Sequence, residues 1–72
     1  MSRLSTEQAS IERAIAKTRE GHDLLNADDY VAAGLAYADA AHYFSLAGNH
    51  ESSWTYQILA REAFKMDRDL NR

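Results

Sequence analysis

The chain of 72 residues contains no cysteine and no proline, and it has only three glycines. Without cysteine, neither a disulfide nor a thiolate metal site can reinforce the fold. Because proline and glycine are the residues that most often interrupt helices, their scarcity favours long helices joined by short turns. A chain of this size buries only about 60% of its unfolded surface. We therefore expect residues 1–72 to form a single helical domain with a thin core.

The sequence also lacks a long apolar run and an excess of positive charge. No segment has the roughly 20 consecutive apolar residues that cross a bilayer, and the polar N-terminus does not resemble a secretory signal, so we expect no membrane contact and a cytoplasmic location. Eight basic and eleven acidic residues give a net charge of −3, and residues 28–48 contain no lysine or arginine. Because phosphate contacts dominate nucleic-acid affinity, this distribution disfavours direct nucleic-acid binding.

Helix start and stop signals divide the chain into three segments. Ser5 can cap the first helix, and either Asn26 or Asp28 can cap the second. Gly48 suits the left-handed position that ends a helix, and Asn49 can cap the third. We predict helices at about residues 5–25, 28–47 and 50–70. Joined by short turns, they give an all-α fold, either an antiparallel hairpin-like array or a compact bundle.

The second predicted helix is apolar on two nearly opposite sides. One stripe consists of Tyr30, Ala33, Tyr37, Ala40, Phe44 and Ala47, and the other consists of Val31, Leu35, Ala38, His42 and Leu46. A helix with two apolar sides is normally buried on both. We expect this helix to lie between the other two, with both stripes buried. The alternative is that one stripe meets a partner or a second copy of the chain.

The first stripe resembles the second helix of a tetratricopeptide-type repeat, in which aromatic and small residues alternate. The matching residues are Tyr30, Ala33, Tyr37 and Ala40. Gly48 stands where that family has the glycine of the turn between repeats. The resemblance covers about half of the chain and implies a repeat-like helical hairpin followed by one further helix, rather than an array of repeats. It also implies a protein-binding role.

The same run of residues, followed by Asn49 and Trp54, is similar to a pattern in the small bacterial ANR-type regulators. Those regulators are short helical proteins that antagonise transcription factors by binding them. This second resemblance implies an antagonist of a transcription regulator. Neither resemblance implies a catalytic residue.

The three histidines are the side chains best suited to a metal site, and their positions argue against one. In antiparallel helices, His22 and His42 lie about 15 Å apart along the bundle, and His50 lies about 12 Å from His42. A zinc site needs three or four ligands close together. We expect His22 and His42 to be half-buried packing residues. With no cysteine, no phosphate-binding loop and no strand to present a serine nucleophile, the sequence predicts no enzyme activity, no metal and no cofactor.

Trp54, the only tryptophan, lies on the predicted third helix away from its apolar stripe, together with Ile58. Arg61 and Lys65 follow on the same side, and the edge of the second helix at Tyr43 extends the patch. Aromatic residues beside arginine are typical of interface hot spots. We predict that these five residues form a partner-binding surface. The alternative is that Trp54 packs over the turn before it or onto the end of the first helix.

The sequence thus predicts a small non-catalytic protein-binding module that acts as an adapter or as an inhibitor of a larger complex. Its size and acidity are similar to those of phage and mobile-element proteins that block host machinery such as CRISPR effectors, which is an analogy at the level of the class. The alternatives are a structural subunit that buries the second helix in a homodimer and an antagonist of a transcription regulator. Each of these functions covers part of the surface with another protein chain.

Overall fold

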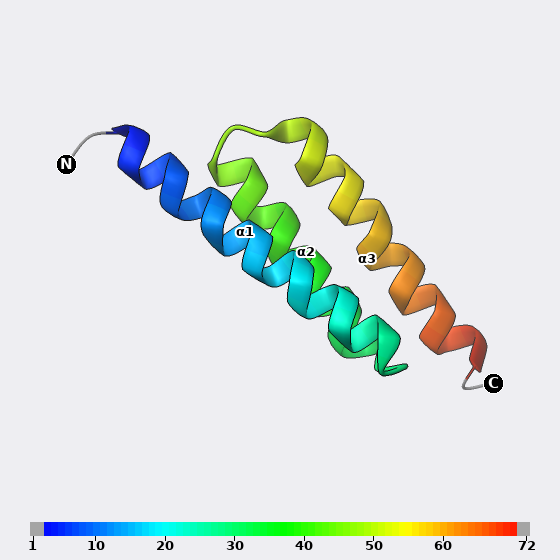
Figure 1. Ribbon diagram of the computed structural model, residues 1–72. Coiled ribbons are helices and arrows are strands. Elements are labelled where there is room, and N and C mark those ends of the chain that lie inside the picture. The colour runs from blue at the N-terminus through cyan, green and yellow to red at the C-terminus, as the bar shows by residue number, and fades with distance from the viewer. Residues whose placement is uncertain (1–2, 71–72) are drawn as a thin grey trace.

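The computed structural model describes the backbone of residues 3–70 and the side chains of residues 6–70. Residues 3–70 form three α-helices, namely α1 (Arg3–Asn26), α2 (Tyr30–Leu46) and α3 (His50–Leu70). α2 lies between α1 and α3 and packs against both, whereas α1 and α3 hardly meet (Figure 1). The predicted all-α fold of three antiparallel helices is confirmed.

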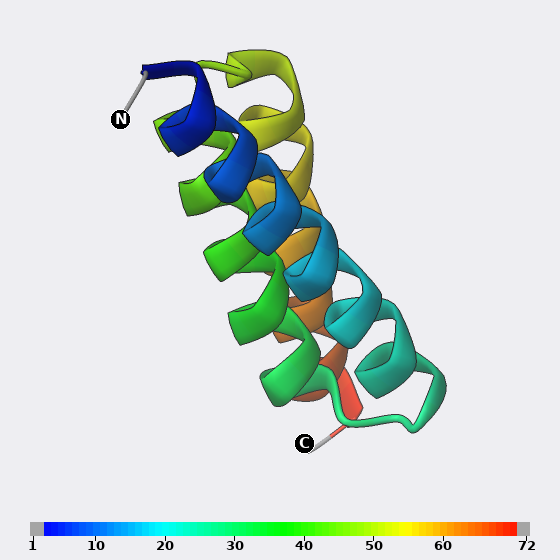
Figure 2. The ribbon, with the colours of Figure 1, turned by 60° about the vertical axis from the view of Figure 1, so that its left-hand side comes forward.

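The array is elongated, with extents of 49 × 19 × 12 Å. Figure 2 shows it from the side, with α1 and α2 in the foreground and α3 behind them. The beginning of α1 and the turn between α2 and α3 lie at the same end of the molecule (Figure 1). None of the helices in the described part of the chain combines the length and apolar character that a bilayer span requires.

α1 begins at Arg3, ahead of the predicted start at residue 5, and runs to Asn26 without a break. The predicted cap by Ser5 concerns a side chain outside the described residues. Gly21 does not interrupt α1, because it serves packing between the helices. A Cβ at this position would lie 2.7 Å from the ring of Tyr37 on α2. Glycine here therefore lets α1 approach the aromatic side chain closely.

The two turns share one backbone arrangement. In the first, Asp28 is left-handed with a φ of 62°, and the N–H of Asp29 donates to a carbonyl in the last turn of α1 at 2.9 Å. In the second, Gly48 has a φ of 81°, and the N–H of Asn49 donates in the same way to α2 at 2.9 Å. This is the Schellman arrangement, in which a left-handed residue closes a helix. As predicted, Gly48 ends α2 and Asn49 caps α3, accepting the N–H of Ser52 at 3.1 Å.

The structure corrects the cap predicted for α2. The N-cap is Asp29, whose carboxylate accepts the N–H of Ala32 at 3.4 Å, and not Asn26 or Asp28. Asp28 does not cap α2 because its left-handed backbone closes α1. Its carboxylate instead accepts the hydroxyl of Tyr30 at 3.0 Å, and this hydrogen bond raises the pKa of Tyr30.

Small residues of α2 bring the three helices close together. The buried residues of α2 are Ala33, Gly34, Ala36, Tyr37, Ala40, Ala41 and Phe44. At Gly34, a Cβ would lie 2.6 Å from the ring of Phe64 on α3. Tyr37 is the largest fully buried side chain, and its ring stacks on that of Tyr56 with centroids 6.0 Å apart. The core is therefore a thin layer of close backbones with aromatic rings between them.

Overpacking this layer should destabilise the protein. Ala40 is fully buried in a cluster with Ala14 and Phe44. We expect Ala40→Leu to cost about 1–3 kcal/mol, because the larger side chain has no space without displacing a helix. Ala38→Leu makes the same change on the exposed side of α2 and should shift stability by no more than about 0.5 kcal/mol. Urea denaturation of both variants beside the parent measures the difference, and equal midpoints would show that the buried side of α2 is assigned wrongly.

The second apolar stripe of α2 is not buried. Val31, Leu35 and Leu46 are 45%, 57% and 58% exposed, so the expectation that both stripes are covered is wrong. The buried residues of α2 form one continuous arc instead of two opposite stripes. Small residues beside the first stripe, such as Gly34 and Ala41, widen that arc because they let a neighbouring helix approach. α1 and α3 thus pack on adjacent sides of α2, and the side opposite to them stays exposed.

Candidate protein-binding surface

The exposed side of α2 carries a row of apolar and uncharged residues along its whole length. We call it the outer row, and it consists of Val31, Leu35, Ala38, His42 and Leu46. Successive members are three or four residues apart, so they share one side of the helix. α2 contains a single charged residue, Asp39, whose carboxylate lies 3.9 Å from the Nζ atom of Lys17 on α1. The outer row itself therefore contains no aspartate, glutamate, lysine or arginine.

A strip of α3 lies beside the outer row. The strip consists of Trp54, Gln57, Arg61, Phe64, Lys65 and Arg68, which follow one side of the helix. The ring of Phe64 lies against Gly34, which neighbours both Val31 and Ala38 on the surface of α2. An open hollow between the helices is lined by Ala38, Ala41, His42 and Ser45 of α2 and by Ser53 and Gln57 of α3. The outer row and the α3 strip therefore form one surface, which we call the outer face.

Four of the five predicted binding residues lie together on α3. Trp54 is 64% exposed, so it is not packed over the preceding turn or onto α1. Arg61 and Lys65 are exposed on the same strip. Ile58 is half-buried one turn after Trp54, at the edge of the strip. The structure thus places these four residues on or beside the outer face.

Tyr43 lies on a different side of the molecule. It is half-buried, and it packs against the cluster that contains Ala14 of α1 and Phe44. The guanidinium carbon of Arg13 lies 6.0 Å from the centre of its ring. Tyr43 is therefore on the α1 side of α2, and the structure does not bring it together with Trp54.

The prediction missed the apolar part of the outer face. Periodicity predicts that Val31, Leu35 and Leu46 belong to a buried stripe, and it does not include Phe64 in the binding surface. Phe64 is 37% exposed and continues the apolar surface from α2 onto α3. The signal in the sequence was the pair of small residues, Gly34 and Ala41, which indicates where the neighbouring helix approaches.

The charged residues of the α3 strip are all positive. Arg61, Lys65 and Arg68 are exposed, and none of them forms an ion pair among the described residues. Lys17 on α1 differs, because its ammonium group lies 3.2 Å from the carboxylate of Glu20, and this hydrogen bond raises the pKa of Lys17. Although the chain has a net charge of −3, the α3 strip carries three positive residues, and the acidic Glu62 and Asp67 flank it.

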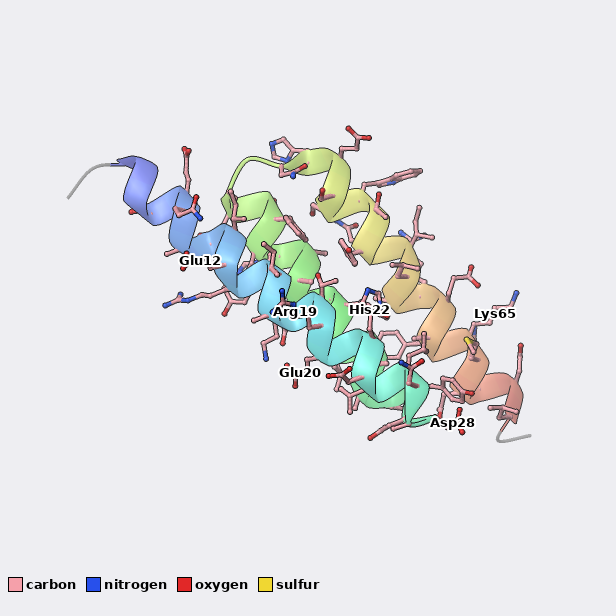
Figure 3. All side chains as sticks on the ribbon, viewed as in Figure 1. Glu12, Arg19, Glu20, His22, Asp28 and Lys65 are labelled. Carbon is pink, nitrogen blue, oxygen red and sulfur yellow. The ribbon has the colours of Figure 1, made fainter. Side chains whose placement is uncertain are left out.

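On the other side of the array, an aromatic cluster surrounds Tyr37. The Nδ1 atom of His22 and the hydroxyl of Tyr37 are 2.6 Å apart, and His22 points from α1 toward α3 (Figure 3). Burial raises the pKa of Tyr37.

Both His22 and His42 are exposed, so the prediction that they are half-buried is wrong. They lie at the edges of the packed arc. No group of three or more metal-ligating side chains comes together among the described residues.

Comparison with known proteins does not supply a function. The chain matches no protein-family model, no curated protein and no solved structure. The resemblances to tetratricopeptide-type repeats and to ANR-type regulators therefore stay predictions.

Proposed function

We propose that this chain is a non-catalytic protein-binding module that docks another protein on its outer face. One observation carries the proposal, which is the exposure of large apolar side chains on two neighbouring helices: Val31, Leu35, Leu46, Trp54 and Phe64. Extended apolar surface of this kind is uncommon on monomeric proteins and marks interaction sites. Trp54 and Arg61, two turns apart on the same side of α3, add the residue types that dominate interface hot spots.

The fold suits docking because every residue of the outer face belongs to a helix. Helices hold side chains in place before binding, so little conformational entropy is lost when a partner docks. Docking also stabilises a thin core, by about 2.7 kcal/mol when the free partner is at a hundredfold excess over Kd. A single docking face suffices for an inhibitor of a larger complex, including an antagonist of a transcription regulator. An adapter needs a second face as well.

Affinity capture from an extract of the cells that produce the protein tests this proposal. Leu35→Ser removes an outer-row side chain. Leu70→Ser is the matched control, since Leu70 is 67% exposed and lies in line with the buried Ala63, away from the α3 strip. Quantitative mass spectrometry should show at least one protein that the parent and Leu70→Ser retain and Leu35→Ser loses. If all three baits capture the same proteins, the outer face is not the binding surface.

A structural subunit of a homodimer is the second candidate. It is favoured by the spacing of Val31, Leu35, Ala38 and His42, which alternates between four and three residues as in the seam of a two-helix coiled coil. Light scattering over a concentration series separates the two candidates. A dimer that Leu35→Ser dissociates supports the subunit, whereas a monomer at all concentrations supports a module for a different protein.

A further inference from the structure

The outer face has an uncharged side and a positive side, and this asymmetry limits what can cover it. The uncharged side is the outer row of α2, and the positive side consists of Arg61, Lys65 and Arg68 on α3. We infer that the partner presents an amphipathic helix whose acidic residues lie along the edge that faces α3. This inference rests on the proposed function, and it names the chemistry of the partner.

The outer row sets the length and pattern of the incoming helix. The distance from Val31 to Leu46 is about 22 Å at 1.5 Å per residue, which corresponds to a helix of about 16 residues. Because the row follows helical spacing, apolar residues at the same spacing on a second helix meet it side by side. At its centre, the small side chain of Ala38 borders the hollow that His42 and Gln57 also line. The small side chain of Ala38 leaves room there for a larger side chain of the partner.

The basic residues occupy only one half of the outer face. The ring of Phe64 lies against Gly34, in the N-terminal half of α2, and Gln57 lies across the hollow from the middle of α2. Because α2 and α3 are antiparallel, residues 61–68 run beside the N-terminal half of α2. Trp54 lies beside its C-terminal end. The acidic residues of the partner therefore gather in one half of its helix, and apolar residues in the other half meet Trp54.

A second copy of the chain matches this surface poorly. Its α2 offers a single charged side chain, Asp39, and Lys17 already lies 3.9 Å from that carboxylate. The positive edge of one copy would thus face little available negative charge on α2 of the other, while each copy carries a net charge of −3. A nucleic acid would leave the apolar outer row without a partner. Charge complementarity at an interface rim favours an acidic protein helix instead.

Three synthetic peptides of about 16 residues, the length of the outer row, test the inference. All have leucines at helical spacing and no tryptophan. The first peptide carries glutamates along one edge of its apolar side, in one half of its length. The second carries lysines at those positions, and the third is a scrambled version of the first. Trp54 is the only tryptophan of the protein, so its fluorescence reports occupation of the outer face directly. We expect the glutamate peptide to bind about tenfold more tightly than the lysine peptide at low salt, an advantage that shrinks as salt is added.

Charge-reversal variants show whether the α3 edge causes this preference. Arg61→Glu combined with Lys65→Glu should make the protein prefer the lysine peptide. Arg13→Glu combined with Arg19→Glu is the matched control, because it reverses the same number of charges on α1, and Lys65 on α3 points away from α1 (Figure 3). The control should keep the preference of the parent for the glutamate peptide.

The possible outcomes separate this inference from the proposed function. Equal binding of the glutamate and lysine peptides overturns the charge requirement, and the capture experiment with Leu35→Ser still decides whether the outer face binds protein. The inference is overturned if none of the three peptides binds. It is also overturned if a single-stranded oligonucleotide binds and the glutamate peptide does not. A stable dimer that Leu35→Ser dissociates also overturns it, because a second copy then covers the outer face.

Discussion

Tyr37→Ala should leave the protein mostly unfolded at 25 °C. Tyr37 is 2% exposed, and Gly21, His22 and Tyr56 surround its ring from α1 and α3. Removing a buried aromatic ring costs about 3–5 kcal/mol. A domain this small and without disulfides has a total stability of about 3–5 kcal/mol. The loss is therefore comparable to the whole free energy of unfolding, and the helical signal in circular dichroism should fall to that of a largely unfolded chain.

Tyr37→Phe is the control, because it keeps the ring and removes only the hydroxyl that pairs with His22. The loss of one hydrogen bond costs about 0.5–1.5 kcal/mol, so this variant should stay folded. Tyr37→Phe should also change how the free energy of unfolding depends on pH above 10. Burial raises the pKa of Tyr37 above its ordinary value of 10.0. The contribution of the neutral phenol to stability is complete below pH 10 and is lost as the pH rises through the folded-state pKa.

Tyr37→Phe has no such hydroxyl, and it should lose less stability above pH 10 than the parent does. Urea denaturation at pH 7 and above pH 10 measures both effects. If Tyr37→Ala were as stable as Tyr37→Phe at neutral pH, the ring would not be part of the core.

Local signals predicted the three helices because caps and turns depend on a few neighbouring residues. Gly48 and Asn49 are the preferred residue types for the left-handed and capping positions, so the second turn was predicted correctly. The first turn places Asp28 in the same left-handed conformation, which residues other than glycine seldom adopt. The sequence therefore predicts the cap of α2 at Asn26 or Asp28, whereas the structure has it at Asp29.

The exposure of the outer row was not predictable from periodicity, because it depends on where α3 packs around α2. Both apolar stripes of α2 offer a side for packing. The small residues Gly34 and Ala41 let α3 approach next to the first stripe, so α3 does not cover Leu35 or Leu46. The same packing leaves Trp54 on the exposed side, where the helical wheel of α3 had placed it.

Trp54→Ala should weaken binding of the captured partner by about 2 kcal/mol or more, which is roughly a 30-fold increase in Kd. Tryptophan contributes this much when it becomes fully enclosed by the partner. In the free protein, Trp54 is 64% exposed, so its truncation removes few internal contacts. The free energy of unfolding should change by no more than about 0.5 kcal/mol. Leu70→Ala is the matched control, since Leu70 is 67% exposed, and it should leave both quantities unchanged.

The outer face as a docking surface is tested most directly by a paired measurement on Trp54→Ala. A binding titration with the captured partner gives the change in Kd, and a thermal melt of the free variant gives the change in stability. We predict a melt like that of the parent together with a loss of affinity of roughly 30-fold or more. A clearly lowered melting temperature with an unchanged Kd would show that Trp54 stabilises the fold and not a complex, and it would contradict docking at the outer face.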